Sequence, residues 1–442
     1  MDLTQGVGVE KGAVMGRSGA TRLCSLLVML ALFAGGCLGG DSGAPEEPDT
    51  LTIQHSFPAS IAEGPPLKKA IQGFQKENPD IEIKQNVVDI LDSPEVYETS
   101  LVAGDAPEII LINLYAKPTE WLEQDATEPV TDWIEQWGLK DRVKDLALQQ
   151  WTHENGELQG FPYTGFSWPV WYNTKLLDSA GLGEVPTSTD GLIEASEKLT
   201  GAGAGPFVVG GSDWSGNKLF WQVMQSYLTN EEAIELFRSG EFSGSANALK
   251  GIELFVRLRD AGIFVEAVEG LTADVMDSQF YSGEAAIMSA GSWAFAGLPD
   301  KLVDSVQLGG MPVPDDAVQD KPTAYAGYTT LGIWVSPNGA EKIDVVRKFV
   351  EYLYRPKVAG SFVEMSDGIF SALEVPYDKQ KLHPLQAAAL TELDEKVSYV
   401  VLPDTYIPSD VLTATERATS LAFTPGTGVD EIVSALESAY QE

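Results

Sequence analysis

The part of the chain before residue 113 alternates strand and helix patterns, and this alternation restricts the fold more than any other feature. Aliphatic side chains typical of strands occur at 51–53 and 81–87. Between them, apolar residues at i, i+3, i+4 and i+7 over 67–74 indicate an amphipathic helix. A second helix is predicted at 97–102, and 109–112 is a continuous apolar run, as expected of a parallel strand covered on both faces. This β-α-β-α-β order predicts an α/β fold with a parallel sheet.

The length and the sheet type together predict where a ligand would bind. A chain of 442 residues exceeds what one hydrophobic core usually serves, so two lobes are expected. Ligands of parallel sheets bind beyond the carboxyl ends of the strands. This rule selects His55 and Ser56 after the first strand, and Asn113 and Tyr115 after the third.

An aromatic stretch at 160–173 contains six aromatic residues, two prolines and two glycines. Aromatic faces suit flat partners, and proline holds the chain extended, so one interpretation is a stiff crossover beside a cleft. On that interpretation Phe166 and Trp168 are candidate ligand-binding residues. A buried core strand with a tight turn is the other interpretation, and both remain open at this point.

Several segments carry a resemblance to a known family. Residues 155–182 follow the order "dGk.yglPy … YN..l...aGl", residues 104–108 resemble "GdaPDv", and residues 280–293 resemble "F..GkaAM...GsW". Glutamate replaces the usual aspartate at position 108, and Glu284 replaces the common lysine. In this order the segments resemble the family 1 extracellular solute-binding proteins. These are receptors of ATP-binding-cassette (ABC) importers, of carbohydrate-binding type, and they include maltose-binding protein.

The resemblance implies a periplasmic-binding-protein type of fold, in which two α/β lobes are crossed three times by the chain and enclose a ligand cleft. Lobe 1 is expected at 51–165 and 326–368, and lobe 2 at 166–325 and 369–442. It also implies closure about the crossovers and delivery of the ligand to the transmembrane subunits of an ABC permease. We expect a monomer.

The resemblance also supplies further candidate residues for the cleft. Trp214 and Lys218 lie in a loop that follows a predicted strand, at glycines spaced like a P-loop. The Lys-Ser/Thr pair of a P-loop is absent there, so nucleotide binding is not predicted. Trp293 is expected at a strand end, where it either stacks on a sugar or packs into the core of lobe 2. The remaining candidates are Tyr328 in the second crossover and Tyr406 and Asp410 near the C-terminus.

The N-terminus is typical of an exported lipoprotein. Arginines precede the apolar run at 23–33, which is too short to span a bilayer and fits a signal-peptide core. The run ends in Ala34-Gly35-Gly36-Cys37, which resembles a lipobox. We therefore expect a signal peptide at 1–36, and at 37–50 a lipidated Cys37 with a flexible acidic tether. The mature protein would then lie on the outer face of the cytoplasmic membrane, held by its lipid alone.

Charge and composition narrow the ligand class. The net charge of −36 opposes binding to nucleic acid or to an anionic membrane surface. Ten tryptophans favour a carbohydrate, since a sugar's apolar face stacks on aromatic rings. A phosphorylated ligand would normally require clustered arginines, which the proposed loops lack. We expect no cofactor.

Catalysis is not indicated by any motif. The histidines His55, His153 and His383 are far apart and have no cysteine-rich or H-x-x-x-H partner, so neither a zinc site nor a charge-relay arrangement is predicted. A pair of glycosidase carboxylates is defined by its separation in space, however, and acidic residues are abundant. A surface-anchored glycan hydrolase or lyase therefore remains the alternative function.

Overall fold

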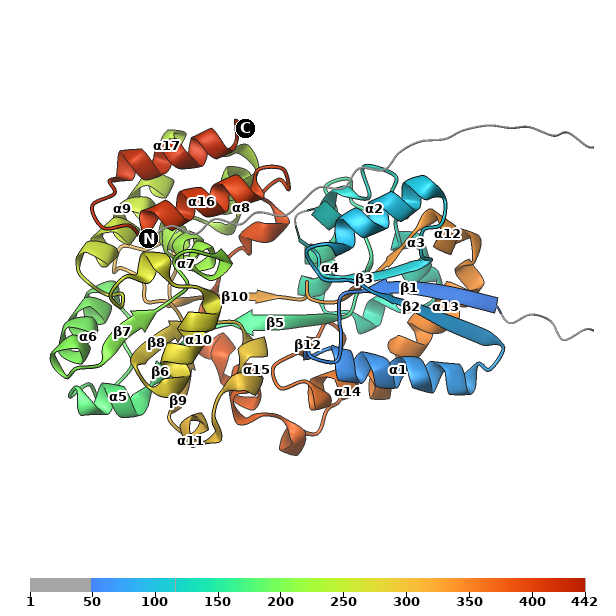
Figure 1. The fold of residues 1–442 in the computed structure, drawn as a ribbon, viewed down its shortest axis with the longest axis horizontal. Helices are drawn as coiled ribbons and strands as arrows, with labels where there is room; N and C mark the ends of the chain where they lie inside the picture. The colour runs from blue at the N-terminus through green and yellow to red at the C-terminus, as the bar shows by residue number, and fades with distance from the viewer. Residues whose placement is uncertain (1–48, 116, 442) are drawn as a thin grey trace, which may run out of the picture. The chain divides into compact units, whose positions relative to one another are not determined.

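The computed structural model describes residues 49–115 and 117–441 (Figure 1). The predicted signal peptide, Cys37 and most of the tether lie outside the described residues. The first strand, β1 (Asp49–His55), begins two residues before the expected start at Leu51.

Lobe 1 is built on a five-stranded sheet of order β2-β1-β3-β11-β4. β1 pairs in parallel with both β2 and β3, and β11 pairs antiparallel with β3 and β4. The other strands are β2 (Ile81–Val87), β3 (Ile109–Ile112), β4 (Phe161–Pro162) and β11 (Gly332–Val335). The predicted β-α-β-α-β unit is confirmed, because β1, α1, β2, α2 and β3 follow one another in this order.

The helices of lobe 1 surround a core of aliphatic and aromatic side chains in which all four residues of β3 are fully buried. A parallel strand in the middle of a covered sheet has no solvent face, which explains its continuous apolar run. The helices are α1 (Gly64–Glu77), α2 (Ser93–Ala103), α3 (Thr131–Gln136), α4 (Asp145–Trp151), α12 (Pro337–Glu341), α13 (Ile343–Leu353) and α14 (Pro356–Met365), with the 3₁₀ helices η1 (Lys117–Glu120) and η2 (Lys140–Arg142). Pro356 was expected only to stop a helix, and it also occupies the first turn of α14.

Lobe 2 has its own core and a four-stranded sheet of order β7-β8-β6-β9. Its strands are β6 (Val170–Asn173), β7 (Gly205–Val208), β8 (Ala285–Ser289) and β9 (Val306–Gly309). Its helices are α5 (Thr174–Ser179), α6 (Thr189–Gly201), α7 (Trp214–Met224), α8 (Asn230–Ser239), α9 (Ala246–Asp260), α10 (Ala273–Ser282), α11 (Asp300–Val303), α15 (Pro384–Lys396), α16 (Leu412–Ala422) and α17 (Val429–Ala439). The shorter 3₁₀ helices are η3 (Gln225–Tyr227), η4 (Phe242–Gly244), η5 (Val268–Gly270), η6 (Ser292–Gly297) and η8 (Pro403–Thr405). A further one, η7 (Lys379–Lys381), contacts α14 of lobe 1.

A third sheet, of order β12-β5-β10-β13, contains the segments that pass from one lobe to the other. We call it the crossover sheet: β5 (Thr164–Trp168), β10 (Thr323–Gly327), β12 (Phe370–Ser371) and β13 (Ser398–Tyr399). β5 and β10 run antiparallel and side by side, and β12 pairs with the other edge of β5 (Figure 1). The predicted α/β class with two lobes is confirmed, while the residue limits that we gave to each lobe remain a prediction.

The aromatic stretch at 160–173 forms three short strands, β4, β5 and β6, and every residue in it is buried. Both sequence interpretations therefore hold in part. The stretch is core strand at its two ends, and its middle segment, β5, belongs to the crossover sheet.

Candidate functional site

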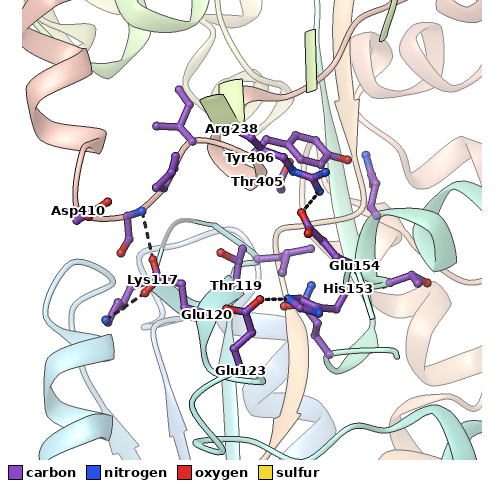
Figure 2. Close-up of a pocket in the computed structure, with 17 residues that line it drawn as sticks. Lys117, Thr119, Glu120, Glu123, His153, Glu154, Arg238, Thr405, Tyr406 and Asp410 are labelled. Atoms are coloured by element: carbon purple, nitrogen blue, oxygen red, sulfur yellow. Dashed lines mark hydrogen bonds and ion pairs between the residues drawn. The ribbon is translucent and has the colours of Figure 1, made fainter. Parts of the chain in front are cut away.

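A polar cavity of about 640 Å³ is lined by side chains of both lobes (Figure 2). Lobe 1 contributes side chains between positions 114 and 123, around η1, and between 150 and 159, from α4 onward. Lobe 2 contributes Arg238 from α8 and the segment at 405–410. The cavity is therefore one place where the two lobes face each other.

Two polar contacts join the lobes at this cavity. The Arg238 guanidinium lies 2.6 Å from the Glu154 carboxylate, and the backbone N–H of Ser409 donates to Glu120 Oε1 at 3.3 Å (Figure 2). The side chains of Arg238 and Glu154 are 42% and 59% exposed, so water weakens the attraction between them.

The other two basic side chains that line the cavity also face carboxylates. Lys117 Nζ lies 3.3 Å from Glu120 Oε2, and His153 Nε2 lies 3.1 Å from Glu123 Oε1 (Figure 2). With Arg238 paired as well, each basic side chain of the described lining already has an acidic partner. The cavity is thus poorly suited to a phosphate or another anion, which would have to compete with these carboxylates.

Four of the predicted aromatic residues come together elsewhere and form what we call the aromatic group: Phe166, Trp168, Trp214 and Trp293. The Trp168 ring lies 5.1 Å from the Trp293 ring and 5.5 Å from the Trp214 ring, and the Phe166 ring lies 5.3 Å from the Trp293 ring. Trp168 is 2% exposed, whereas Trp214 is 40% exposed. The group therefore has a buried base and an accessible indole face. None of its members lines the cavity, to which Tyr406 and Asp410 belong instead.

Trp293 lies in η6, four residues beyond the last residue of β8, and not at the strand end where we expected it. The neighbouring Ser292 is fully buried, and its hydroxyl bonds to two crossover segments: it donates to Gly368 O at 2.5 Å and accepts from Ser167 N at 3.3 Å. Gly368 has a φ of 129°, and a Cβ there would collide with the Ser292 carbonyl. The turn that carries Trp293 is thereby fixed to two crossovers at once.

Lys218 lies one turn after Trp214 on α7 and is buried in an ion pair. Its Nζ lies 2.6 Å from Asp404 Oδ1, and the two side chains are 6% and 20% exposed. Burial raises the pKa of the nearby Glu416 carboxyl, and the Lys218 charge partly offsets this effect. The Lys218 charge is therefore already paired with Asp404, a residue that the sequence analysis did not select.

The lobe 1 candidates differ in how much hydrogen-bonding capacity they still offer. His55 is buried with both ring nitrogens engaged, Nδ1 by the Phe57 N–H at 3.2 Å and Nε2 by Gln85 Oε1 at 3.3 Å. Burial lowers the pKa of His55, which keeps the ring neutral near pH 7. Tyr115 donates to Ile90 O at 2.8 Å, and burial, followed by the charge of Asp89, raises its pKa to about 12.

Ser56 and Asn113 lie at the carboxyl ends of β1 and β3, as predicted, and each has a buried oxygen that finds no hydrogen-bond partner among the described residues. Tyr328 follows β10, and its hydroxyl accepts a hydrogen bond from Lys144 at 3.0 Å. Buried acceptors without partners are unusual in proteins, so Ser56 Oγ and Asn113 Oδ1 are the predicted lobe 1 residues' atoms that could still take a ligand hydrogen bond.

Within residues 49–115 and 117–441, no helix is both long and apolar enough to cross a bilayer. In the same part of the chain, no three His, Cys, Asp or Glu side chains are grouped so as to hold a metal ion.

Comparison with known proteins identifies the class of protein. Residues 58–360, more than half of the chain, match the family of bacterial extracellular solute-binding proteins. The chain belongs to this family, as the motifs predicted. It is an exported solute-binding protein and not an enzyme, so the alternative of a glycan hydrolase or lyase is wrong.

Individual relatives agree with this assignment. The solved structure of a probable secreted solute-binding lipoprotein from Streptomyces coelicolor is 41% identical, with a TM-score of 0.83 over 90% of this chain and 100% of that one. The multiple sugar-binding protein of Streptococcus mutans is 23% identical over 78% of this chain and 81% of its own length. The sn-glycerol-3-phosphate-binding periplasmic protein of Shigella flexneri is 23% identical over 74% of this chain and 75% of its own length.

Proposed function

We propose that this solute-binding protein captures a sugar or an oligosaccharide between its lobes and delivers it to the permease of an ABC importer. The observation that carries the proposal is the aromatic group, in which the exposed Trp214 is held by rings packed behind it. A pyranose ring has an apolar face that stacks on an indole, and its hydroxyls need hydrogen-bond acceptors such as Asn113 Oδ1.

The relatives suggest two ligand classes, a sugar and a glycerol phosphate, and the charges of this chain favour the sugar. Each basic side chain of the cavity has an acidic partner, and so does Lys218 beside the aromatic group. A phosphate bound at either of these two places would have to displace carboxylates from those cations. A neutral ligand would not.

A thermal-shift screen followed by calorimetric titration tests the proposal. The soluble chain from residue 38 onward would be tested with glucose, galactose, maltose, raffinose, xylobiose and N,N′-diacetylchitobiose, and with sn-glycerol 3-phosphate for comparison. We expect at least one sugar to raise the melting temperature, since a ligand that binds only the native state stabilises it, and chromatography should recover that sugar unchanged. A shift with sn-glycerol 3-phosphate alone would contradict the sugar proposal.

Closure of the lobes is part of the proposed function. The chain passes between the lobes through the few strands of the crossover sheet, so each lobe can rotate while keeping its own core. The predicted lobe limits, with changes near residues 165, 325 and 368, place these hinges in or beside β5, β10 and β12. Small-angle scattering should give a smaller radius of gyration when the bound sugar is saturating. An unchanged profile would argue against closure.

The lipid anchor at Cys37 remains a proposal, as does the monomeric state. The apolar run and small residues before Cys37 motivate the anchor, and the similar Streptomyces coelicolor protein is described as a probable secreted lipoprotein. In a bacterial host, Cys37→Ala should move the full-length protein from the membrane fraction into the soluble extracytoplasmic fraction. Cys24→Ala, a change within the predicted signal peptide, is the matched control and should leave the protein on the membrane.

A further inference from the structure

α10 is held at both ends by segments that carry tryptophans of the aromatic group. At its start, the Ala273 N–H donates to Asp213 Oδ2 at 2.6 Å, and Asp213 directly precedes Trp214. Near its end, the Tyr281 hydroxyl donates to Ala294 O at 2.8 Å, and Ala294 directly follows Trp293. α10 therefore spans the distance between the two tryptophan-bearing segments.

Asp277 projects from α10 between these two contacts. Positions 273, 277 and 281 are four residues apart, which places their side chains one above another on the same face of a helix. The buried residues of α10, Met276 and Phe280, lie beside this row of side chains, so Asp277 borders the core-facing side of the helix. The Trp214 and Trp293 rings lie 6.3 Å apart, so the segments at the two ends of this face are neighbours.

The Asp277 carboxylate is only partly satisfied. Its Oδ1 is buried and has no hydrogen-bond partner among the described residues. A buried acceptor without a partner costs folding free energy, and a carboxylate costs more than a neutral group. A group that opposes folding in this way suggests a function in which a ligand supplies the missing hydrogen bond.

We propose that Asp277 is a ligand-binding residue whose carboxylate accepts a hydrogen bond from a hydroxyl of the sugar that stacks beside Trp214 and Trp293. This inference rests on the proposed sugar-binding function. Lobe 2 would then make two kinds of contact with the sugar. The tryptophans would stack on the apolar face of the sugar ring, and Asp277 would select for a hydroxyl at one position of that ring.

The surroundings of Asp277 predict a pH dependence. Burial, followed by the charge of Asp274, raises the pKa of Asp277 to about 6. Asp274 and Tyr281 on the same helix are the titratable groups that interact with it, and Asp213 bonds the backbone at the helix start. Strands β7 and β8, which pack on α10, contain no titratable group. Sugar affinity should therefore be full above pH 6 and should fall as the carboxylate becomes protonated below it.

The same pKa shift predicts that the stability of the ligand-free protein falls as pH rises, whereas sugar affinity rises. Because the pKa in the folded state exceeds the ordinary value of 3.8, the folded chain binds a proton more readily than the unfolded chain. The ionised carboxylate thus destabilises the fold as pH rises through about 6. A substitution that removes the charge should leave the melting temperature at pH 8 unchanged or raise it.

Asp277→Asn tests the inference, with Asp274→Asn as the matched control on an exposed position of the same helix. The titrant is whichever sugar of the screening panel binds the wild-type chain most tightly. Loss of a hydrogen bond to a charged acceptor should weaken binding by about ten- to a hundredfold at pH 8. The dependence of affinity on pH around 6 should disappear in this variant, and its ligand-free melting temperature should not fall. Asp274→Asn should bind like the wild type.

The outcomes separate the inference from the function on which it rests. Wild-type affinity in Asp277→Asn, with the pH dependence retained, overturns the assignment of Asp277 and leaves sugar binding intact. Weaker binding together with a lower melting temperature of the ligand-free variant assigns Asp277 a structural role and also overturns the inference. Absence of binding by the wild-type chain to every sugar of the panel overturns both.

Discussion

The two lobes prepare for a ligand in different ways. On the lobe 2 side the aromatic group is already assembled, with Trp168 of the crossover sheet buried against Trp293 and the exposed Trp214 of lobe 2. In lobe 1 the candidate side chains at the strand ends are of two kinds. Some, such as His55, already form hydrogen bonds within the lobe, and others, such as Asn113, have a buried acceptor without a partner. An apolar surface can be stable without ligand, whereas an unpaired acceptor gains most when a ligand supplies its hydrogen bond. We infer that lobe 2 supplies most of the affinity and lobe 1 completes it on closure.

The largest expected effect is in lobe 2. Trp293→Ala should weaken sugar binding by about a hundredfold, because a stacking tryptophan near the centre of a site contributes a few kcal/mol. Trp293 is partly buried against Phe166 and Trp168, so we also expect a modest fall in melting temperature. Calorimetric titration and thermal melting of the same preparation measure both effects.

Trp133→Ala is the control for this experiment. Trp133 is also partly buried and stacks on Trp137 at 6.1 Å, but it lies in α3 of lobe 1, outside the aromatic group. The Trp133→Ala variant should be less stable than the wild type and should keep its sugar affinity. Intact affinity in a destabilised Trp293→Ala protein would instead place Trp293 in the core of lobe 2 and reverse the comparison between the lobes.

A smaller effect is expected in lobe 1. Asn113→Ala removes one neutral hydrogen-bonding side chain and should weaken binding by about tenfold. Since its buried Oδ1 has no partner in the ligand-free chain, stability should change little. Asn247→Ala, which removes an amide that bonds Glu232 on lobe 2, is the control for general effects of losing an asparagine. A loss of affinity larger than that of Trp293→Ala would show that lobe 1 dominates binding.

The fold was predictable because it depends on local patterns. Aliphatic runs such as 109–112 and the helical spacing over 67–74 lie within single elements. The order of apolar residues within each element is enough to indicate which of its faces is buried. The sequence also selected Trp168, Trp214 and Trp293 separately, each from its own motif. It did not predict that they pack together, because that contact joins segments far apart in the chain.

The polar part of the site was less predictable, for the same physical reason. Lys218 was selected, but its partner Asp404 is 186 residues away and belongs to no motif. Asp277 is one of 65 acidic residues, and no motif or spacing marks its buried, unpartnered oxygen, a feature that it shares with Glu63. The position of Trp293 in η6 depends on the Ser292 hydroxyl and its two crossover partners, and such a three-segment contact leaves no periodic signal.

The smallest expected effect is at the contact between the lobes. Arg238→Gln breaks the ion pair with Glu154, but both side chains are largely exposed, so the pair contributes no more than about 1 kcal/mol. Sugar affinity should therefore change by less than about fivefold at low salt, and the difference should vanish near 0.5 M salt, where exposed charges are screened. The control is Arg257→Gln, an exposed arginine that lies 3.9 Å from Asp190 within lobe 2 and should have no effect on affinity at either salt concentration. A change above tenfold in Arg238→Gln that persists at high salt would mean that this contact, rather than the aromatic group, sets the balance between open and closed lobes.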